Sequence, residues 1–108
     1  MSFETAIRDA IWDEARALTR AQRARAKAIL TAEDAAEDCY FSSDATDEDN
    51  TPMAVLMELG IEPLDYPRYW DDAEEKSDAD KAEGIATWQA VIDAVLEVMD
   101  DIDRWDLA

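Results

Sequence analysis

Carboxylates are the side chains of this sequence that could do chemistry. The chain has 108 residues, of which 28 are Asp or Glu, 10 are Lys or Arg and none is His. In two stretches the acids recur three or four residues apart. On a helix such acids form a row, in which neighbouring carboxylates are about 5–6 Å apart along the axis. Rows of fixed anions are suited to binding a basic surface. The two sets are Asp93, Glu97, Asp100 and Asp101, and Glu33 and Glu37 with Asp34 and Asp38 beside them.

Two further runs of acids could extend these rows. They are Asp47, Glu48 and Asp49 in a polar loop over 43–50, and Asp71, Asp72, Glu74 and Glu75 after an aromatic stretch. Duplex DNA carries one negative charge per about 1.7 Å of its axis. Residues 31–108 hold four basic and 24 acidic residues, and a helix about 40 Å long is predicted among them. The charge densities of duplex DNA and of this acidic segment are of the same order. We therefore expect these acids to bind in the basic groove of another protein, in the place of a nucleic acid.

Catalytic and metal chemistry of the familiar kinds is disfavoured by the composition. Without His, no Ser-His-Asp triad and no His-based zinc site can form. Gly60 and Gly84 are the only glycines, which is too few for the usual phosphate-binding loop. A calcium-binding frame that begins at Asp47 would place Pro52 where that loop requires Gly. The sequence therefore predicts a protein that is not an enzyme and that holds neither a cofactor nor a metal.

Charge is divided unevenly along the chain. The net charge is −18, yet residues 1–30 hold six basic residues and only four acidic ones. The large negative charge disfavours direct binding to nucleic acid or to an anionic membrane. A basic row in the first segment has two interpretations, which are a solvated or internally paired face and a separate binding surface. This row consists of Arg16, Arg20, Arg23 and Lys27.

Hydrophobic periodicity predicts that helices alone position these residues. An apolar stripe predicts a basic-faced first helix over 3–30, and a seam spaced 3, 4, 3, 4, 3 predicts a long last helix over about 78–105. Ser77 is a suitable N-cap for the last helix. No alternating strand pattern occurs. We expect an all-α fold, with residues 1–108 forming a single acidic domain, a small bundle of about four helices with a long C-terminal helix.

Capping signals predict two shorter helices between these long ones. Thr31 would be the N-cap of a helix over about 32–42. The dipeptide Thr51-Pro52 would begin a helix over about 52–59, and Gly60 would end it. The acidic body over 31–108 would then contain every predicted helix except the first.

Apolar residues outside the regular seam have alternative interpretations. The run Tyr66-Pro67-Arg68-Tyr69-Trp70 either forms a stacking platform or fastens a long loop to the helical core. Cys39, the one cysteine, is expected to be a small buried residue because neighbouring carboxylates disfavour a thiolate. The wide apolar face of the last helix is covered either by the other helices or by a second copy in a homodimer.

A local pattern in the second half of the chain resembles a known class. Met53-Ala-Val-Leu-Met-Glu-Leu-Gly-Ile-Glu is an apolar helix that ends in Gly-Ile-acid, and an acidic linker and a long acidic-faced helix follow it. This pattern is similar to antirestriction proteins of the overcome-classical-restriction type. The whole chain resembles the small acidic helical DNA-mimic proteins of phages and mobile elements, which include anti-CRISPR proteins. The resemblance implies inhibition of a CRISPR effector or restriction enzyme by surface acids.

Two other functions fit the same composition. The chain could be an acidic helical adaptor for a basic protein that does not act on nucleic acid, or its acidity could serve solubility in high salt. Adaptation to high salt would be expected to make the whole surface acidic, including the first helix. The basic row on that helix therefore argues against this alternative. The chain start lacks the basic and apolar regions of a signal peptide, and no apolar stretch is long enough to span a membrane. We therefore expect a cytoplasmic protein, located in the host cytoplasm if a phage encodes it.

Overall fold

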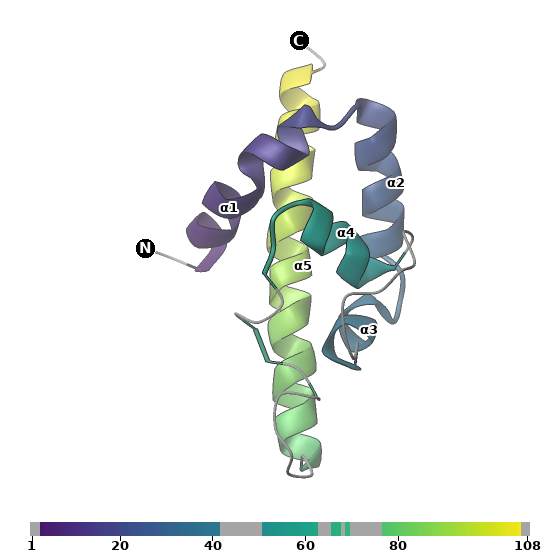
Figure 1. Ribbon diagram of the computed structural model, residues 1–108, viewed down its shortest axis with the longest axis vertical. Coiled ribbons are helices and arrows are strands. Elements are labelled where there is room, and N and C mark those ends of the chain that lie inside the picture. The colour runs from purple at the N-terminus through teal and green to yellow at the C-terminus, as the bar shows by residue number, and fades with distance from the viewer. Residues whose placement is uncertain (1–2, 42–50, 63–65, 68, 70–76, 107–108) are drawn as a thin grey trace.

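The fold consists of helices around one long axial helix. The computed structural model describes residues 3–41, 51–62, 66–67, 69 and 77–106, and within these ranges it contains five helices and no strand (Figure 1). The all-α class and the long C-terminal helix are therefore confirmed. The helices are α1 Phe3–Ala17, α2 Arg20–Leu30, α3 Ala35–Phe41, α4 Pro52–Glu58 and α5 Asp78–Asp106.

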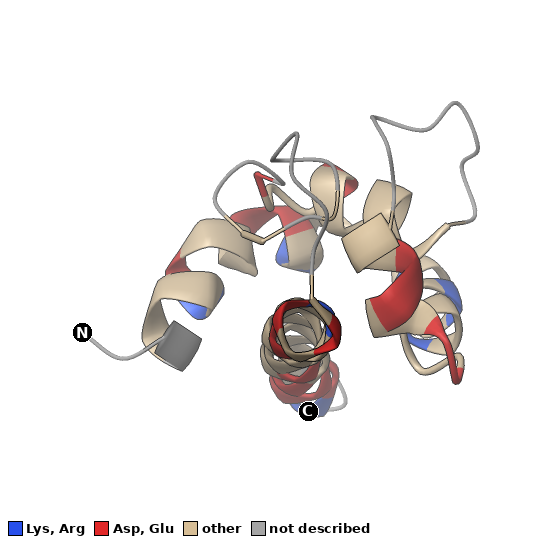
Figure 2. Cartoon of the chain, turned by 90° about the horizontal axis from the view of Figure 1, so that it is seen from below, with Lys and Arg blue, Asp and Glu red and all other residues tan. Residues whose placement is uncertain are grey.

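Helix α5 is the element on which the rest of the bundle packs. Helices α1, α2 and α3 each contact α5, and α4 packs on α2 and α3. Seen along α5, the other helices form an arc around one side of it and leave a strip of α5 open (Figure 2). The molecule measures 50 × 33 × 21 Å along its principal axes. None of the described helices is both long and apolar enough to cross a membrane.

The predicted seam of α5 forms the centre of the core. Ile7, Ile11 and Ala15 of α1 pack into the same cluster, so α1 and α5 share one apolar interface. The sequence allowed the apolar face of α5 to be covered either by the other helices or by a second copy. In the structure, α1, α2 and α3 pack on this face. The α5 residues buried in the core include Trp88, Val91, Ile92, Val95, Val98, Met99 and Ile102.

The predicted single helix over 3–30 is wrong, because the chain breaks at Leu18-Thr19. Thr19 begins α2 with a reciprocal cap. Its Oγ1 accepts a hydrogen bond from the Gln22 backbone N–H at 3.1 Å, and Gln22 Oε1 accepts one from the Thr19 N–H at 2.8 Å. Two donors at the start of α2 are satisfied in this way, so a second helix begins without continuing α1. Both helices can then lie against α5 in different directions.

Thr31 ends a helix and does not begin one, so its predicted role as an N-cap is also wrong. Its hydroxyl and its backbone N–H both donate to the Lys27 carbonyl, at 2.8 and 2.9 Å. Thr31 therefore serves the C-terminus of α2, where carbonyls lack helical partners. Helix α3 begins only at Ala35, after a short turn.

The other predicted caps are confirmed. Thr51 Oγ1 accepts from the Ala54 N–H at 3.2 Å, and Pro52 is the first residue of α4. Gly60 follows α4 with φ of +105°, a conformation that L side chains rarely adopt. Ser77 Oγ accepts from the Asp80 N–H at 3.2 Å and so begins α5.

The described residues of the aromatic stretch fasten it to the core. The Trp88 indole N–H donates to the Pro67 carbonyl, and the Tyr66 ring lies 5.3 Å from the Trp88 ring. Tyr69 lies 6.4 Å from Tyr40 between ring centroids. This geometry agrees with the fastening interpretation. Trp70 lies outside the described residues.

Candidate functional site

The predicted row of acids on α5 is divided by the fold into exposed and paired carboxylates. Asp93 and Glu97 are exposed on α5, and Asp93 Oδ1 accepts a hydrogen bond from Gln89 Nε2 at 2.9 Å. Asp100 is 58% exposed, but its Oδ1 lies 2.9 Å from Lys27 Nζ. Asp101 is 24% exposed and is paired twice. Among the described residues, two of the four carboxylates in this row, Asp93 and Glu97, form no ion pair and are open to a partner.

The two cations on Asp101 come from opposite ends of the chain. Arg8 of α1 donates through Nη2 to Asp101 Oδ2. Arg104, one turn further along α5, places Nη1 3.3 Å from Asp101 Oδ1. The Arg8 guanidinium also lies over the Trp12 ring, 5.2 Å from its centroid. Asp101 thus holds α1 against α5 and is a structural group.

Arg23 is the buried centre of this arrangement, with an exposed fraction of only 2%. Its Nε donates to Asp103 Oδ1 at 2.7 Å, and its Nη1 donates to the carbonyls of Ala15 and Leu18 at 3.2 and 2.6 Å. Those carbonyls belong to the C-terminal end of α1, where helical partners are missing. The Arg23 side chain of α2 therefore caps the C-terminal end of α1 and also binds Asp103 of α5.

Lys27 completes what we call the internal ion-pair cluster. Besides Asp100, its Nζ binds Asp103 Oδ2, so Asp103 accepts from two cations. The interpretation of the basic row as internally paired is thus confirmed for Arg23 and Lys27, whereas Arg16 and Arg20 are exposed. The internal ion-pair cluster comprises Arg8, Arg23 and Lys27 with Asp100, Asp101 and Asp103.

The ion pairs shift the protonation equilibria of the cluster. Burial alone would raise the pKa of Asp103, but hydrogen bonds from Lys27 and Arg23 and their positive charges outweigh it and lower that pKa below 3.8. Burial alone would lower the pKa of Lys27, but hydrogen bonds to Asp103 and Asp100 and their negative charges raise it above 10.5. The folded state therefore favours the charged form of both groups.

Substitution of Asp103 should give a pH-dependent loss of stability. A depressed carboxyl pKa stabilises the fold above about pH 4 and ceases to do so as the pH falls through the folded-state value. We expect Asp103→Asn to lower the free energy of unfolding by about 2 kcal/mol at pH 7. The difference from wild type should be smaller at pH 3 than at pH 7, because protonation of Asp103 begins to remove the charge that the cluster stabilises. Urea unfolding at both pH values measures it.

The exposed Asp93 provides the control for this experiment. Asp93→Asn should change the free energy of unfolding by less than about 0.5 kcal/mol at either pH, as surface substitutions usually do. An Asp103→Asn deficit that is equally large at pH 3 and pH 7 would show that the carboxylate charge is not what stabilises the cluster.

The second predicted set of acids has the opposite character. Glu33, Asp34, Glu37 and Asp38, here called the α3 acidic cluster, are all exposed. The first two lie in the turn before α3 and the last two in its first turn. Among the described residues, no Lys or Arg forms an ion pair with any of them. Figure 2 shows acidic segments both on α5 and on the helices around it.

The remaining predicted site residues belong to two acidic runs. Asp47, Glu48 and Asp49, and Asp71, Asp72, Glu74 and Glu75, all lie outside the described residues. Of the predicted site residues that the structure describes, the exposed carboxylates without an ion pair to a described residue are therefore the α3 acidic cluster, Asp93 and Glu97.

Groups that could do covalent or metal chemistry are few in the described structure. Cys39 is fully buried, and burial, with a smaller contribution from the charge of Asp38, raises the pKa of its thiol from 9.0 to about 12. A thiol of that pKa is almost entirely protonated at neutral pH and is a poor nucleophile. Within the described ranges, no group of three or more Cys, Asp or Glu residues is arranged to hold a metal ion.

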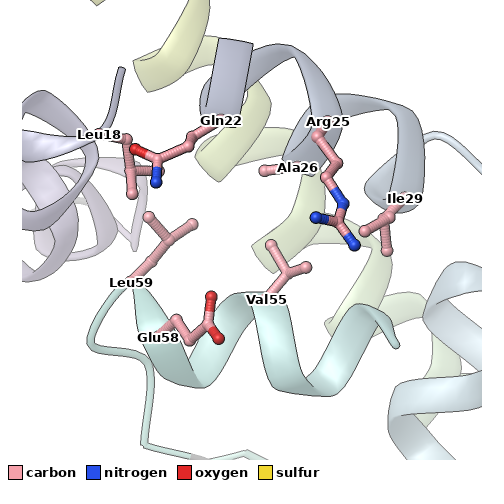
Figure 3. Close-up of a pocket in the computed structure, with 8 residues that line it drawn as sticks. All are labelled: Leu18, Gln22, Arg25, Ala26, Ile29, Val55, Glu58 and Leu59. Atoms are coloured by element: carbon pink, nitrogen blue, oxygen red, sulfur yellow. The ribbon is translucent and has the colours of Figure 1, made fainter. Parts of the chain in front are cut away.

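A hollow of about 280 Å³ separates α2 from α4 (Figure 3). Leu59 and Val55 of the α4 segment point into it towards Leu18 and Ala26. Its polar lining includes Arg25 and Glu58, and also Gln22, whose Oε1 is already engaged by the Thr19 cap. A hollow with this lining offers a charged rim over an apolar floor and no nucleophile.

Comparisons of the chain with protein-family models, with curated proteins and with solved structures give no match. Function must therefore be inferred from the charge and geometry of this molecule.

Proposed function

We propose that the protein is a non-catalytic inhibitor that imitates the charge of a nucleic acid. It would occlude the basic groove of a bacterial defence complex, either a CRISPR effector or a restriction enzyme. The observation that supports this most strongly is the separation of charges. The α3 acidic cluster is exposed and unpaired among the described residues, whereas Arg8, Arg23 and Lys27 are paired internally.

This separation reduces the basic surface of the first segment to the exposed Arg16, Arg20 and Arg25. Three of its six cations bind acids of α5 and so do not form a positive surface. The net charge of −18 is therefore carried outward by acids, and a long-range negative field of this size steers a basic partner to the molecule.

The exposed acids are also held at defined spacings. Asp93 and Glu97 lie one turn apart on α5, about 6 Å along its axis. Glu37 and Asp38 are fixed by α3, whose buried residues pack on α5. Anions held by rigid helices lose little conformational entropy on binding, which is the advantage of a preorganised ligand.

Mutual repulsion within the α3 acidic cluster indicates that it is not there for stability. Four carboxylates within six residues, none of them paired with a cation among the described residues, repel one another, which costs a few tenths of a kcal/mol for each close pair. Cations of a partner would relieve that repulsion. We therefore expect the cluster to favour binding at a small cost to the isolated fold.

Neutralising the α3 acidic cluster should weaken partner binding without unfolding the protein. We expect the variant Glu33→Gln, Asp34→Asn, Glu37→Gln and Asp38→Asn to recover at least about tenfold less of its partner, since each charged contact contributes to steering and affinity. Its melting temperature should be equal to or above that of wild type. Quantitative mass spectrometry of proteins retained from a bacterial lysate, with circular dichroism melting, measures both.

A matched variant separates position from total charge. Asp9→Asn, Glu14→Gln, Glu58→Gln and Glu83→Gln change the net charge by the same amount at exposed sites elsewhere. We expect this control to lose less than about threefold in recovery, as screened long-range charges do. Equal losses in the two variants would mean that the α3 acidic cluster makes no specific contact.

A further inference from the structure

A groove of about 390 Å³ lies where α1 meets the last turns of α5. It is lined by Trp12, Arg16, Ile102 and Trp105. Trp105 is 76% exposed, twice the 37% of Phe41 and Met57, which are the other large hydrophobic residues exposed in the described structure. An indole this exposed beside an apolar hollow is typical of an interface anchor.

The charges around this groove are of both signs. Helix α1 carries Asp13 and Arg16 one turn apart, both exposed, and α5 carries the Asp101–Arg104 pair. The α3 acidic cluster, by contrast, contains acids alone. A two-fold contact places a surface against itself, so it requires a patch whose own charges can pair across the axis. The groove meets that requirement, whereas the rest of the described acidic surface would repel its copy.

We propose that the groove binds a second copy of this chain in a two-fold dimer. The Trp105 indole of each copy would lie in the groove of the other copy, against Trp12 and Ile102. The contact would be at the C-terminal end of α5, well removed from α3 (Figure 1). Two acidic bodies can then associate with their α3 acidic clusters exposed and far apart. This inference does not depend on the proposed function.

Sedimentation equilibrium of the isolated protein tests the dimer. At about 0.5 M NaCl the Debye length is about 4 Å, so repulsion between the two bodies is largely screened. We expect the mass to rise from 12.2 kDa towards twice that value between low micromolar and about 0.5 mM protein. Trp105→Ala should raise the dissociation constant at least about tenfold, whereas Met57→Ala should leave it unchanged. A constant monomer mass, or a dimer that Trp105→Ala does not weaken, would overturn the proposal.

A cysteine placed next to the contact gives an independent test that does not remove the indole. Cys39 is buried, so Arg104→Cys provides one accessible thiol per chain. Residue 104 precedes Trp105, so the proposed contact brings the two introduced thiols into one interface, and oxidised glutathione should link the chains faster than in the control Glu37→Cys. Adding Trp105→Ala to Arg104→Cys should abolish the difference. Equal rates of linkage in Arg104→Cys and Glu37→Cys would show that the groove is not the contact.

Discussion

Replacing Arg23 by Ala should lower the free energy of unfolding by about 3–5 kcal/mol, as expected when one partner of a buried ion pair is removed. The change removes the Arg23 donor from the Leu18 carbonyl, leaves the Ala15 carbonyl only its 3.3 Å bond from the Leu18 N–H, and deprives Asp103 of one of its two cations. Domains of this size are stable by only about 5–15 kcal/mol, so the loss is a large fraction of the total. Urea denaturation at pH 7 measures it.

Two further variants show whether position or charge is responsible. Arg20→Ala removes an exposed cation from the same helix and should cost less than about 0.5 kcal/mol. Arg23→Lys keeps the charge but cannot donate to Asp103 and to two carbonyls in one planar arrangement, so it should recover less than half of the loss. An Arg23→Ala variant as stable as Arg20→Ala would contradict the structural role assigned to this side chain.

Gly84→Ala should destabilise the protein by about 1–3 kcal/mol, the usual cost of overpacking a core. In an exposed helix the same change stabilises by about 1 kcal/mol, because Ala is the better helix former. At Gly84 an added Cβ would lie 2.1 Å from Tyr40 Cε1 and 2.6 Å from Cδ1, far inside van der Waals contact. The Tyr40 ring is itself buried against α5 and cannot move away freely. Thermal unfolding measures the sign and the size of the effect.

A double-mutant cycle assigns the effect to the ring. In the background Tyr40→Leu the added Cβ has more room, so Gly84→Ala should cost less there than in wild type. The coupling energy should be at least about 1 kcal/mol. If Gly84→Ala instead raised the melting temperature, as at an ordinary helical glycine, the close packing of α3 on α5 would be wrong.

The capping residues at the ends of α4 and at the start of α5 allowed the positions of these helices to be predicted from the sequence. Thr51-Pro52, Gly60 and Ser77 bound α4 and α5 as expected, because each cap acts within one turn of its own position. The sequence Thr19-Arg-Ala-Gln22 is also a capping signal, but it stands within an Ala-rich run that by itself favours one continuous helix. Intrinsic propensity and the cap therefore made opposite predictions, and the cap prevailed.

The break at Thr19 also explains why the site was only partly predictable. In one continuous helix, Arg16 and Arg23 would share a face, as the predicted basic row requires. Because α2 begins anew at Arg20, Arg23 and Lys27 turn towards α5, while Arg16 lies beside the groove of Trp12.

The ion pairs between residues far apart in the sequence could not be predicted from the spacing of charged residues. The hydrogen-bonded pairs of the internal ion-pair cluster join residues between 76 and 93 positions apart in the sequence. No local sequence pattern predicts which acids of α5 form ion pairs with Arg8, Arg23 and Lys27. The exposure of Glu37 and Asp38 was easier to predict, since they lie opposite the apolar residues Cys39 and Tyr40 within one short helix.

The proposed imitation of nucleic acid is tested most directly by competition. The protein is immobilised, a bacterial lysate is passed over it, and retained proteins are eluted either with duplex DNA or with polyglutamate at matched charge concentration. Retention of a nucleic-acid-binding defence complex, released by DNA at a charge concentration at least about tenfold lower than by polyglutamate, is the predicted result. A partner that stays bound in excess duplex DNA, or that both polymers release equally, would contradict the proposal.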